Sequence, residues 1–293
     1  ARNYTEKHVN IHLFRQKNKG AGGARNRGLE VTKGDYIYFL DADDYIANNV
    51  LKTLLDLAYI NKLEILVFNS WYAEDGAEPN FSPPKLENNV LKVVDGMAYI
   101  IEPGLRNSAC LYIFKKSLLV DTGIKFKEGR FMEDSIFSAS LILKVRRVSK
   151  VKLDVHRYVN VENASTTNTD PTHLLKFIDD LVYAIEEFDV LIKGLNNSHL
   201  NYDKVVKVYK KKQQSFVFTL FIKAYRYPHL NFNDLKKILL KLRKLDVYPI
   251  NPKIGGIGGN MTSLVYTIIV LPIFNNKTLL FLSLRIMRLI SSR

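Results

Sequence analysis

The stretch KGDYIYFLDADDYIANN, residues 33–49, predicts both the fold of this chain and the place of its functional site. Residues 35–40, DYIYFL, are mostly β-branched and aromatic, so we expect a buried strand there. Three carboxylates follow at once: Asp41, Asp43 and Asp44. In open parallel sheets, ligands bind at the carboxyl ends of the strands, so we expect these acids to face a substrate.

Two interpretations of the acids remain open. Side chains alternate along a strand, so Asp41 and Asp43 are expected to point to the same side, with Ala42 leaving space between them. Such a pair repels itself unless a cation lies between, and hard divalent ions bind carboxylate oxygens while leaving sites for phosphate oxygens. Alternatively, Asp44 or Asn48 could cap the helix that the following residues predict, which is the simpler interpretation of a lone Asp-x-Asp motif.

The neighbouring segments predict an α/β domain over residues 1–170. The runs VNIHLF (9–14) and EILVFNSW (64–71) are further strand candidates. Between the first strand candidate and the acidic stretch lies NKGAGGARNRGLEVTKG (18–34), whose glycines lead into a short helix that we expect to end at Gly34 as its C-cap. The order strand, glycine-rich turn, helix, strand predicts a mostly parallel, Rossmann-like sheet with crossover helices.

Residues 171–260 have helical periodicity and predict a helical subdomain packed on the sheet. In FNDLKKILLKLRKL (232–245), the apolar positions share one face and Asn233 is the expected N-cap. That shared face consists of Leu235, Ile238, Leu239, Leu242 and Leu245. The lysines of KVYKKKQQ (207–214) are expected on a solvated surface.

The tail, residues 261–293, is apolar but interrupted. Pro272 and the NNK of residues 275–277 break it before it reaches the ~20 apolar residues that a membrane span needs. The segment 278–293 places arginines among leucines and isoleucines, which suits either a helix in an anionic membrane interface or a buried C-terminal helix.

The composition is that of an ordinary globular protein with an excess of positive charge. The 293 residues carry 43 Lys and Arg against 29 Asp and Glu, a net charge of +14. Anionic partners are therefore favoured, whether nucleic acid, nucleotide phosphates or an acidic membrane surface. Cys110 is the single cysteine, which excludes an intramolecular disulfide and a zinc cluster built from cysteines.

Residues 18–46, NKGAGGARNRGLEVTKGDYIYFLDADDYI, resemble almost position for position the nucleotide-sugar site of family 2 glycosyltransferases, which have the GT-A fold. The family pattern runs Asn-x-Gly, Ala-Arg-Asn, Gly and then a strand that ends in Asp-x-Asp-Asp. Each piece is weak alone, but the ordered set is specific. The matching residues are Asn18, Gly20, Ala24, Arg25, Asn26, Gly28, Gly34, Asp41, Asp43 and Asp44.

The resemblance implies a nucleotide-diphosphate donor, for which we expect a UDP-sugar, and Mn²⁺ or Mg²⁺ as the cofactor. It implies that Asp43 holds the metal and that Asp41 holds the metal or the ribose. The metal would offset the charge of the departing diphosphate. The residues that the resemblance assigns to the nucleotide sugar are Asn18, Gly20, Arg25, Asn26, Asp41 and Ala42.

A second stretch, GIKFKEGRFMEDSIFSASLI (123–142), resembles the family's second signature, in which a Glu-Asp pair opens a helix. The resemblance gives Asp134 the role of general base, with Glu133 beside it. An acceptor hydroxyl has a high pKa and must lose its proton as it attacks, and a positioned carboxylate can take that proton. Taken without the first motif, the pair would more simply be acids that favour a helix N-terminus.

The chain departs from the family in two loops. In HRYVNVENASTTN (156–168), Val159 stands where many members have an arginine that contacts phosphate; Arg157 or Ser165 could substitute. In ACLYIFKKSLL (109–119), the positions of a usual Trp-Asx-Lys motif hold Cys110, Leu111 and Tyr112, so we expect a different recognition of the acceptor.

The family's opening strand, V-S-V-I-I-P-x-Y-N, and its Asp-Asp-Gly-Ser turn are not found in this sequence. We therefore expect Ala1 to follow that turn and ~40 residues of the first βα unit to be missing. On this expectation the intact gene product is the enzyme, and the chain as given binds the donor poorly.

The resemblance implies an inverting, metal-dependent glycosyltransferase that adds a sugar to a saccharide or lipid-linked acceptor of a bacterial surface polysaccharide. It is expected in the cytoplasm, peripherally bound at the inner face of the plasma membrane. A sugar nucleotidyltransferase, an inactive fragment and a basic nucleic-acid-binding protein are the alternatives. Nucleic acid is disfavoured because no recognised binding motif accompanies the basic stretch at 207–218.

Overall fold

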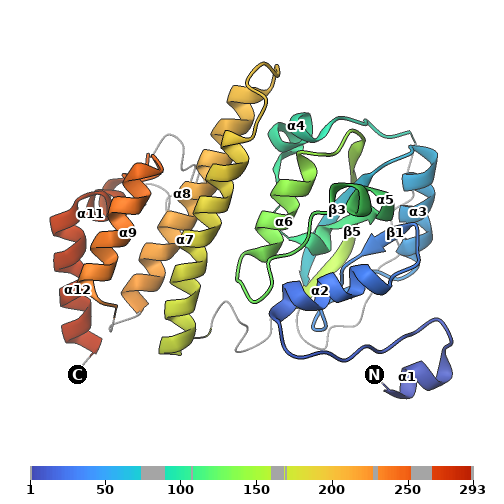
Figure 1. Ribbon diagram of the computed structural model, residues 1–293, viewed down its shortest axis with the longest axis horizontal. Helices are drawn as coiled ribbons and strands as arrows, with labels where there is room; N and C mark the ends of the chain where they lie inside the picture. The colour runs from blue at the N-terminus through green and yellow to red at the C-terminus, as the bar shows by residue number, and fades with distance from the viewer. Residues whose placement is uncertain are drawn as a thin grey trace.

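A computed structural model describes residues 2–73, 90–106, 108–159, 168, 170–226, 230–251 and 266–291. An α/β region is followed by a set of longer helices, as Figure 1 shows. The expected α/β fold with a helical C-terminal region is therefore present. The segments 74–89 and 160–167, which include Ser165, lie outside the described residues.

The elements follow in this order along the chain. The α/β region contains α1 (Arg2–Lys7), α2 (Gly20–Val31), β1 (Tyr36–Tyr38), β2 (Tyr45–Ile46), α3 (Val50–Ile60), β3 (Ile65–Ala73), α4 (Gly96–Tyr99), β4 (Tyr112–Lys115), α5 (Lys116–Thr122), α6 (Glu133–Ile142) and β5 (Val148–Val159). The helical region contains α7 (Pro171–Lys193), α8 (Tyr202–Arg226), α9 (Phe232–Lys244), α11 (Leu271–Asn275) and α12 (Lys277–Ser291).

The described strands form one mixed sheet in the order β1-β4-β3-β5-β2. Strand β3 runs parallel to β5, whereas β1 and β3 are antiparallel to β4, and β2 is antiparallel to β5. The prediction of a mostly parallel sheet is therefore wrong. Local patterns show where strands lie but not which strands become neighbours, and short strands can pair antiparallel without a crossover helix.

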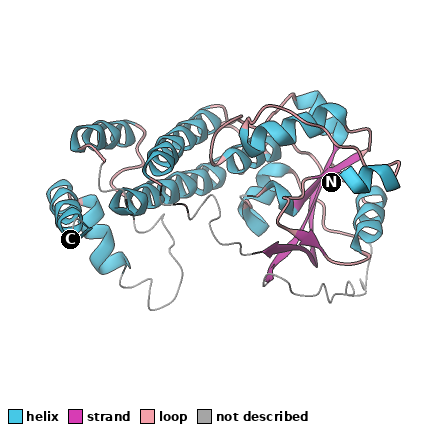
Figure 2. Cartoon of the chain, turned by 90° about the horizontal axis from the view of Figure 1, so that it is seen from below, coloured by secondary structure: helices cyan, strands magenta, loops and turns pink. Residues whose placement is uncertain are grey.

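Buried side chains on both faces explain why β3 is an inner strand. Ile65 and Val67 belong to the larger core cluster, and Leu66 and Phe68 belong to the smaller cluster under α3. Alternate residues thus meet helices on opposite sides, as expected of a strand covered on both faces. Figure 2 shows the strands enclosed between helices.

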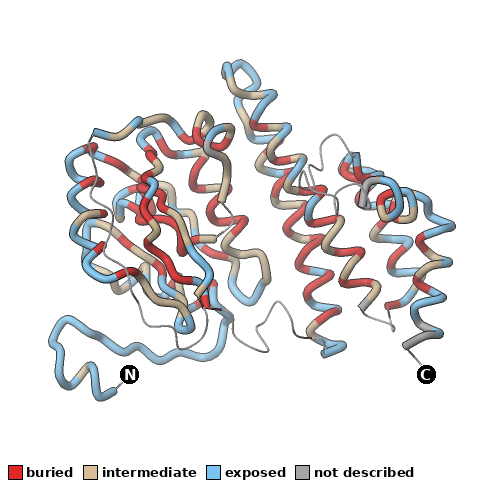
Figure 3. The backbone as a smooth tube through the Cα atoms, turned by 180° about the vertical axis from the view of Figure 1, so that it is seen from behind, coloured by how far each residue is buried: buried red, intermediate tan, exposed pale blue. Residues whose placement is uncertain are grey.

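The predicted strand at residues 9–14 is wrong. Residues 11–19 form neither helix nor strand, and Val9 is 95% exposed. Figure 3 shows this segment running along the outside of the molecule. Strand-forming residues need a partner strand and a surface to pack on, and the described structure offers this segment neither. The predicted C-cap is also wrong, because α2 ends at Val31 and Thr32 is its C-cap.

The helical region shares its core with the sheet. One cluster of buried side chains extends from β1 to α12, and the Tyr209 hydroxyl of α8 donates to the Ala139 carbonyl of α6 at 2.8 Å. Figure 1 shows α7 and α8 side by side, with α7 next to α6. Burial of Leu235, Leu239 and Leu242 confirms the apolar face of α9. Its N-cap, however, is Asn231 instead of Asn233, because Asn231 accepts from the Asn233 N–H.

Within the described residues, no single helix has the length and apolarity of a membrane span. Residues 268–275 and 277–287 pass that test only as a pair, and the two helices meet at an angle of 104°.

Candidate active site

Three segments that are distant in sequence meet at one end of β1. They are the start of α2, the acidic turn Asp41–Asp44 that follows β1, and the N-terminus of α6. The motifs that the sequence analysis singled out therefore lie together.

Arg25 connects these segments. Its Nη2 donates to Asp41 Oδ1 and its Nη1 donates to Glu133 Oε1, each at 2.7 Å. The Arg25 side chain is only 11% exposed, and its guanidinium lies over the Phe126 ring. Burial would lower the pKa of Arg25, but Asp41 and Glu133 offset this effect and raise it. Arg25 thus carries a fixed positive charge between two carboxylates.

The start of α2 is built by Asn18 and two glycines. Asn18 Oδ1 accepts from the Gly20 N–H at 2.9 Å, and Gly20 has a φ of +74°. A Cβ at Gly22 would lie 2.7 Å from the Lys127 carbonyl oxygen, so only glycine lets α2 approach the loop before α6 this closely.

Asn26 has a structural position. It is 6% exposed, its Nδ2 donates to the Phe126 carbonyl, and its Oδ1 accepts from the Phe126 N–H, both at 2.9 Å. Its amide therefore joins α2 to the loop before α6. A contact of Asn26 with the nucleotide sugar stays a prediction.

The acidic segment is a turn and not the end of a strand. Strand β1 stops at Tyr38, and the Asp44 N–H donates to the Asp41 carbonyl at 3.2 Å. The alternation that was expected to align Asp41 with Asp43 does not apply, because residues 42 and 43 lie in the turn. Ala42 and Asp43 are exposed, whereas the Asp41 side chain is 42% exposed and held by Arg25.

Asp44 ties the turn to β5. Its Oδ2 lies 2.9 Å from His156 Nε2, and its Oδ1 accepts from the Val159 N–H at 3.0 Å. His156 Nδ1 in turn lies 2.8 Å from the Tyr38 hydroxyl. Burial raises the pKa of Asp44, and the bonds from Val159 and His156 oppose that shift. No local sequence signal indicated His156, because its partners lie 112 and 118 residues away.

The predicted capping role of Asp44 or Asn48 is wrong. Helix α3 has Asn49 as its N-cap, in the left-handed region with φ 57°, and the Asn49 side chain makes no capping hydrogen bond.

The donor set of the turn fits a divalent ion that shares its ligands with a substrate. No group of three or more His, Cys, Asp or Glu side chains within the described ranges could hold a metal ion. Asp43 and Asp41 offer two carboxylates at the surface. Mg²⁺ commonly binds through one or two carboxylates together with substrate phosphates. The turn therefore suits such a shared site and not a closed site made of protein groups alone.

Asp134, the predicted general base, lies at the N-terminus of α6. It lies in the first turn of α6, as predicted, and its Oδ1 accepts from the Ser135 N–H at 2.7 Å. Burial and the adjacent Glu133 raise the pKa of Asp134 to about 7, while Ser135, Arg25 and Lys212 oppose the shift. A carboxylate with a pKa near neutrality is well matched to proton abstraction.

Lys212 of α8 carries a positive charge that acts on Asp134, and the sequence did not predict this proximity. Its amine lies 4.4 Å from the centre of the Phe216 ring, and burial lowers the pKa of Lys212 to about 8, while Asp134 opposes that shift. The prediction that the lysines of 207–214 lie on a solvated surface agrees with the exposed Lys207 and Lys211, but Lys210 and Lys212 are half-buried. Gln213 and Gln214 of the same stretch are buried. The lysine spacing in the sequence did not indicate this burial, because it follows from the packing of α8 against α6, where Tyr209 contacts Ala139.

Three residues of the two stretches that depart from the family pattern are buried. Arg157 is 2% exposed and donates to the His156 carbonyl, so it lies away from the surface where a phosphate would bind. Cys110 is 1% exposed, and burial, with Asp41 nearby, raises the pKa of its thiol to about 12. Tyr112 is fully buried and bonds to the backbone of Arg106.

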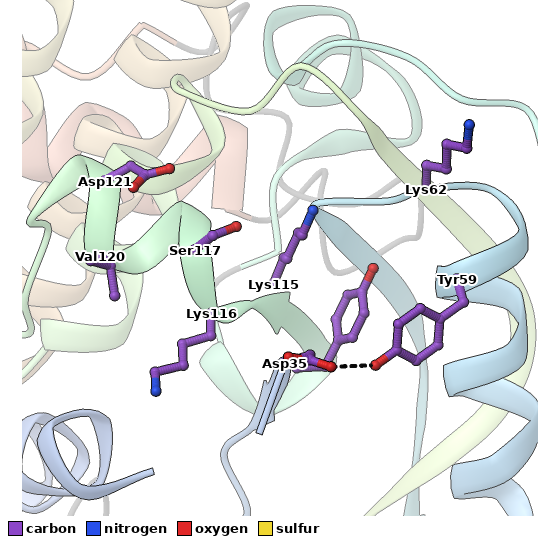
Figure 4. Close-up of a pocket in the computed structure, with 9 residues that line it drawn as sticks. Asp35, Tyr59, Lys62, Lys115, Lys116, Ser117, Val120 and Asp121 are labelled. Carbon is purple, nitrogen blue, oxygen red and sulfur yellow. Dashed lines mark hydrogen bonds between the residues drawn. The ribbon is translucent and has the colours of Figure 1, made fainter. Parts of the chain in front are cut away.

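A separate cavity of about 480 Å³ lies at the opposite end of β1 (Figure 4). Asp35, which precedes β1, accepts from the Tyr59 hydroxyl there at 2.9 Å. Lys62 and Lys115 also line it, and none of the candidate site residues does. The candidate site residues lie at the other end of the strand.

In the described sheet, the acidic turn follows the edge strand β1, and Arg25 links this turn to the Glu-Asp pair that begins α6. Residues 1–119 match the family described as Glycosyl transferase family 2. The resemblance predicted from the motifs is thereby confirmed, and the chain is related to bacterial glycosyltransferases of polysaccharide and teichoic acid synthesis.

Two relatives illustrate the similarity. The uncharacterised glycosyltransferase EpsJ of Bacillus subtilis is 30% identical over 176 residues, which cover 58% of this chain and 50% of EpsJ. The poly(ribitol-phosphate) β-N-acetylglucosaminyltransferase TarP of Staphylococcus aureus is 29% identical over 174 residues, 57% of this chain and 50% of TarP. The chain thus spans about half the length of these relatives.

The crystal structure of S. aureus TarS 1–349 in complex with UDP-GlcNAc has a similar fold. It superimposes with a TM-score of 0.60 at 18% sequence identity and covers 86% of this chain and 69% of TarS 1–349. At this identity the match supports only a similar fold. UDP-GlcNAc is the ligand of TarS in that crystal structure.

Proposed function

We propose that this protein transfers a hexosyl group from a UDP-sugar to a hydroxyl of a saccharide or lipid-linked acceptor in the synthesis of a bacterial surface polymer. The observation that carries the proposal is the double contact of Arg25, which joins the acidic turn at Asp41 to the Glu133–Asp134 helix start. A donor held at the turn would lie beside a carboxylate able to take the acceptor's proton.

The relatives favour UDP-linked hexoses as donors. TarP is named for the transfer of N-acetylglucosamine, a relative from Bacillus spizizenii is named poly(ribitol-phosphate) β-glucosyltransferase, and TarS was crystallised with UDP-GlcNAc. UDP-GlcNAc and UDP-glucose are therefore the first donors to test.

In the proposed reaction, the acceptor oxygen attacks the anomeric carbon as the bond from that carbon to the diphosphate oxygen breaks. Asp134 takes the proton of the acceptor hydroxyl, and UDP leaves with the bonding electron pair. A single base placed for direct displacement inverts the anomeric configuration. Glu133 and Arg25 hold the α6 N-terminus beside the turn, and Arg25 offers a positive charge to the nucleotide.

Asp43 and Asp41 would hold Mn²⁺ or Mg²⁺. When bound, this ion would neutralise part of the negative charge that develops on the departing diphosphate.

The experiment is an assay of UDP release from a panel of UDP-sugars with candidate acceptors, for the wild type and Asp134→Asn. We expect the variant to lose at least about a hundredfold in transfer rate, which is the contribution of a general base, while its affinity for UDP with Mn²⁺ is kept. Full activity in the variant would refute the base assignment. Release of pyrophosphate from a nucleoside triphosphate and a sugar phosphate would instead indicate a nucleotidyltransferase.

We also propose that α12 binds the protein peripherally to the inner face of the plasma membrane. Its Leu280 and Leu284 are buried, whereas Leu282, Ile286 and Leu289 are 53%, 49% and 69% exposed. Exposed apolar side chains beside the exposed Arg285 suit an anionic membrane interface.

Sedimentation with phosphatidylglycerol vesicles tests this proposal. We expect binding of the wild type and its loss in the double variant Leu282→Ser and Ile286→Ser. Leu200→Ser, at a site that is 94% exposed but outside α12, is the matched control and should bind as the wild type does. Equal binding of all three proteins would remove α12 from membrane contact.

A further inference from the structure

A cavity of about 230 Å³ lies against β5 and the residues on both sides of α4. Lys150 and Lys152 of β5 line it, with Lys92 from the chain before α4 and Glu102 from the chain after it. None of the residues that we assign to the donor, the metal or the base is among the described residues that line this cavity. The cavity is therefore separate from the candidate active site, and lysine is its most frequent lining residue.

The alternation of side chains along β5 directs two of these lysines to the same face of the sheet. Lys150 and Lys152 are two residues apart, and Val151 and Leu153, which follow them, are buried in the core cluster under α3. Because neighbouring side chains of a strand point to opposite faces, both lysines point away from α3. Tyr99, which also lines the cavity, belongs to the larger core cluster on that other face.

The chain before α4 adds the third lysine. Val94 and Val148 exchange two backbone hydrogen bonds of 2.9 Å as an antiparallel pair, and the Ser149 hydroxyl donates to the Lys92 carbonyl at 2.8 Å. Two residues along each chain from this pair, Lys92 comes to lie alongside Lys150. Like charges in opposite positions of antiparallel chains destabilise the pairing.

The positive charges of the three lysines are not compensated within the described part of the chain. No ion pair or hydrogen bond joins their ammonium groups to a described residue. Burial and the positive charges of Arg106 and Lys152 lower the pKa of Lys150. Glu102 is the one acid among the described lining residues, so two positive charges remain in excess. Such a cluster of cations favours the binding of an anion.

A buried phenol adds a hydrogen-bond donor to this cavity. The Tyr99 side chain is fully buried, and its hydroxyl has no hydrogen-bond partner among the described residues. Tyr112 lies near enough to affect the pKa of Tyr99, but the Tyr112 hydroxyl already donates to the Arg106 carbonyl and accepts from the Arg106 N–H. A buried hydroxyl without a partner is destabilising, and a ligand oxygen could accept from it.

We propose that this cavity binds a phosphate group between its three lysines, with the Tyr99 hydroxyl as a further donor. Lysine ammonium groups form charge-assisted hydrogen bonds with phosphate oxygens, and a phosphate dianion matches the two excess positive charges. The cavity is smaller than the ~300–1,000 Å³ pockets that hold drug-sized ligands, which favours a single phosphate group over a whole nucleotide. The phosphate is either a free anion or the headgroup of a lipid. This site goes beyond the proposed function and does not depend on sugar transfer.

Titration calorimetry of the whole chain with inorganic phosphate, at constant ionic strength, tests the proposal. We expect Lys150→Gln to weaken the affinity at least about tenfold, the usual effect of losing one charge-assisted bond, and Tyr99→Phe to weaken it about fivefold. Lys144→Gln is the matched control and should bind as the wild type does, because Lys144 is exposed and does not line the cavity. No binding by the wild type, or equal affinities of the wild type and Lys150→Gln, would overturn the proposal.

Thermal unfolding provides a second measurement that shows whether the variant folds. Without phosphate, we expect a higher Tm for Lys150→Gln than for the wild type, because the variant removes the repulsion from Lys92 and Arg106. Phosphate stabilises folded proteins in general, but a bound phosphate adds to this effect. The rise in Tm with phosphate should therefore be larger in the wild type and Lys144→Gln than in Lys150→Gln. Equal rises in all three proteins would contradict a specific site.

Sedimentation with vesicles that contain phosphatidic acid distinguishes the two sources of the phosphate. If the site binds a lipid headgroup, Lys150→Gln should reduce binding to these vesicles and Lys144→Gln should not. If the site binds a free anion, both variants should bind the vesicles equally, while the loss in calorimetry remains. Either result supports the phosphate site and assigns its ligand.

Discussion

Arg25 Nη1 lies 2.7 Å from Glu133 Oε1, although 108 residues separate them. This contact joins the helix that follows the glycine-rich turn to the helix that begins with the candidate base. Since the Glu133 side chain is only 12% exposed, its charge depends on Arg25 for compensation.

We expect Arg25→Lys to lower the free energy of unfolding by about 1–3 kcal/mol, because one ammonium cannot reproduce the fork that serves two carboxylates. Urea unfolding measures this loss. Arg27→Lys is the matched control, because Arg27 pairs with Glu30 at the surface two positions along the same helix. A loss as large in the control would show that the two contacts of Arg25 have no special weight.

The pH profile of transfer should report Asp134. The base acts only as a carboxylate, and burial and Glu133 raise the pKa of Asp134 to about 7. We therefore expect kcat/KM to be constant above about pH 7 and to fall tenfold per pH unit well below it. A profile that stays flat down to pH 5 would assign the base to a group with an ordinary carboxyl pKa.

Lys212→Met should move the acidic limb of that profile to higher pH. The positive charge of Lys212 favours the carboxylate form of Asp134, so its removal raises the pKa of the base further. The neighbouring Lys211 is exposed, and Lys211→Met should leave the limb in place. If both variants shift the profile equally, the effect is one of net charge and not of position.

Glu133→Gln should move the same limb to lower pH. Its carboxylate raises the pKa of Asp134, and glutamine removes that charge while its amide oxygen can still accept from Arg25. Opposite shifts in the two variants would establish that Asp134 is the titrating group. Shifts in the same direction would contradict this assignment.

Substitutions of Asp44 and Asp43 should affect different properties. We expect Asp44→Ala to lower stability and Asp43→Ala to weaken donor binding. Asp44→Ala leaves His156 and the Val159 N–H without their acceptor, and we expect a loss of about 2 kcal/mol in the free energy of unfolding. Asp43→Ala changes an exposed side chain and should cost less than about 0.5 kcal/mol.

For UDP binding with Mn²⁺, we expect the opposite order of effects, with the larger loss in Asp43→Ala. Asp43→Ala is expected to weaken UDP binding in the presence of Mn²⁺ and to abolish the loss of activity that chelation with EDTA causes in the wild type. If UDP binds Asp43→Ala and the wild type equally well with Mn²⁺, the metal site is elsewhere.

Local patterns in the sequence predicted several parts of the site. The Glu133–Asp134 pair opens a helix as expected, and the acids follow a short strand, because helix starts and strand candidates depend on residues close in the chain. The same patterns placed a strand at 9–14 that has no partner in the described structure. They also assigned alternation to Asp41 and Asp43, which lie in a turn.

The local patterns did not predict contacts between residues that are distant in the sequence. Neither the pairing of β4 between β1 and β3, nor the bond from His156 to Asp44, nor the approach of Lys212 to Asp134 has a signature in spacing or composition. Each arises when elements that are distant in the sequence pack together, and where this packing buries Asp134 and Lys212 it changes their pKa values. The residue types needed for the chemistry were thus readable in the chain, whereas their electrostatic state and their partners follow from packing.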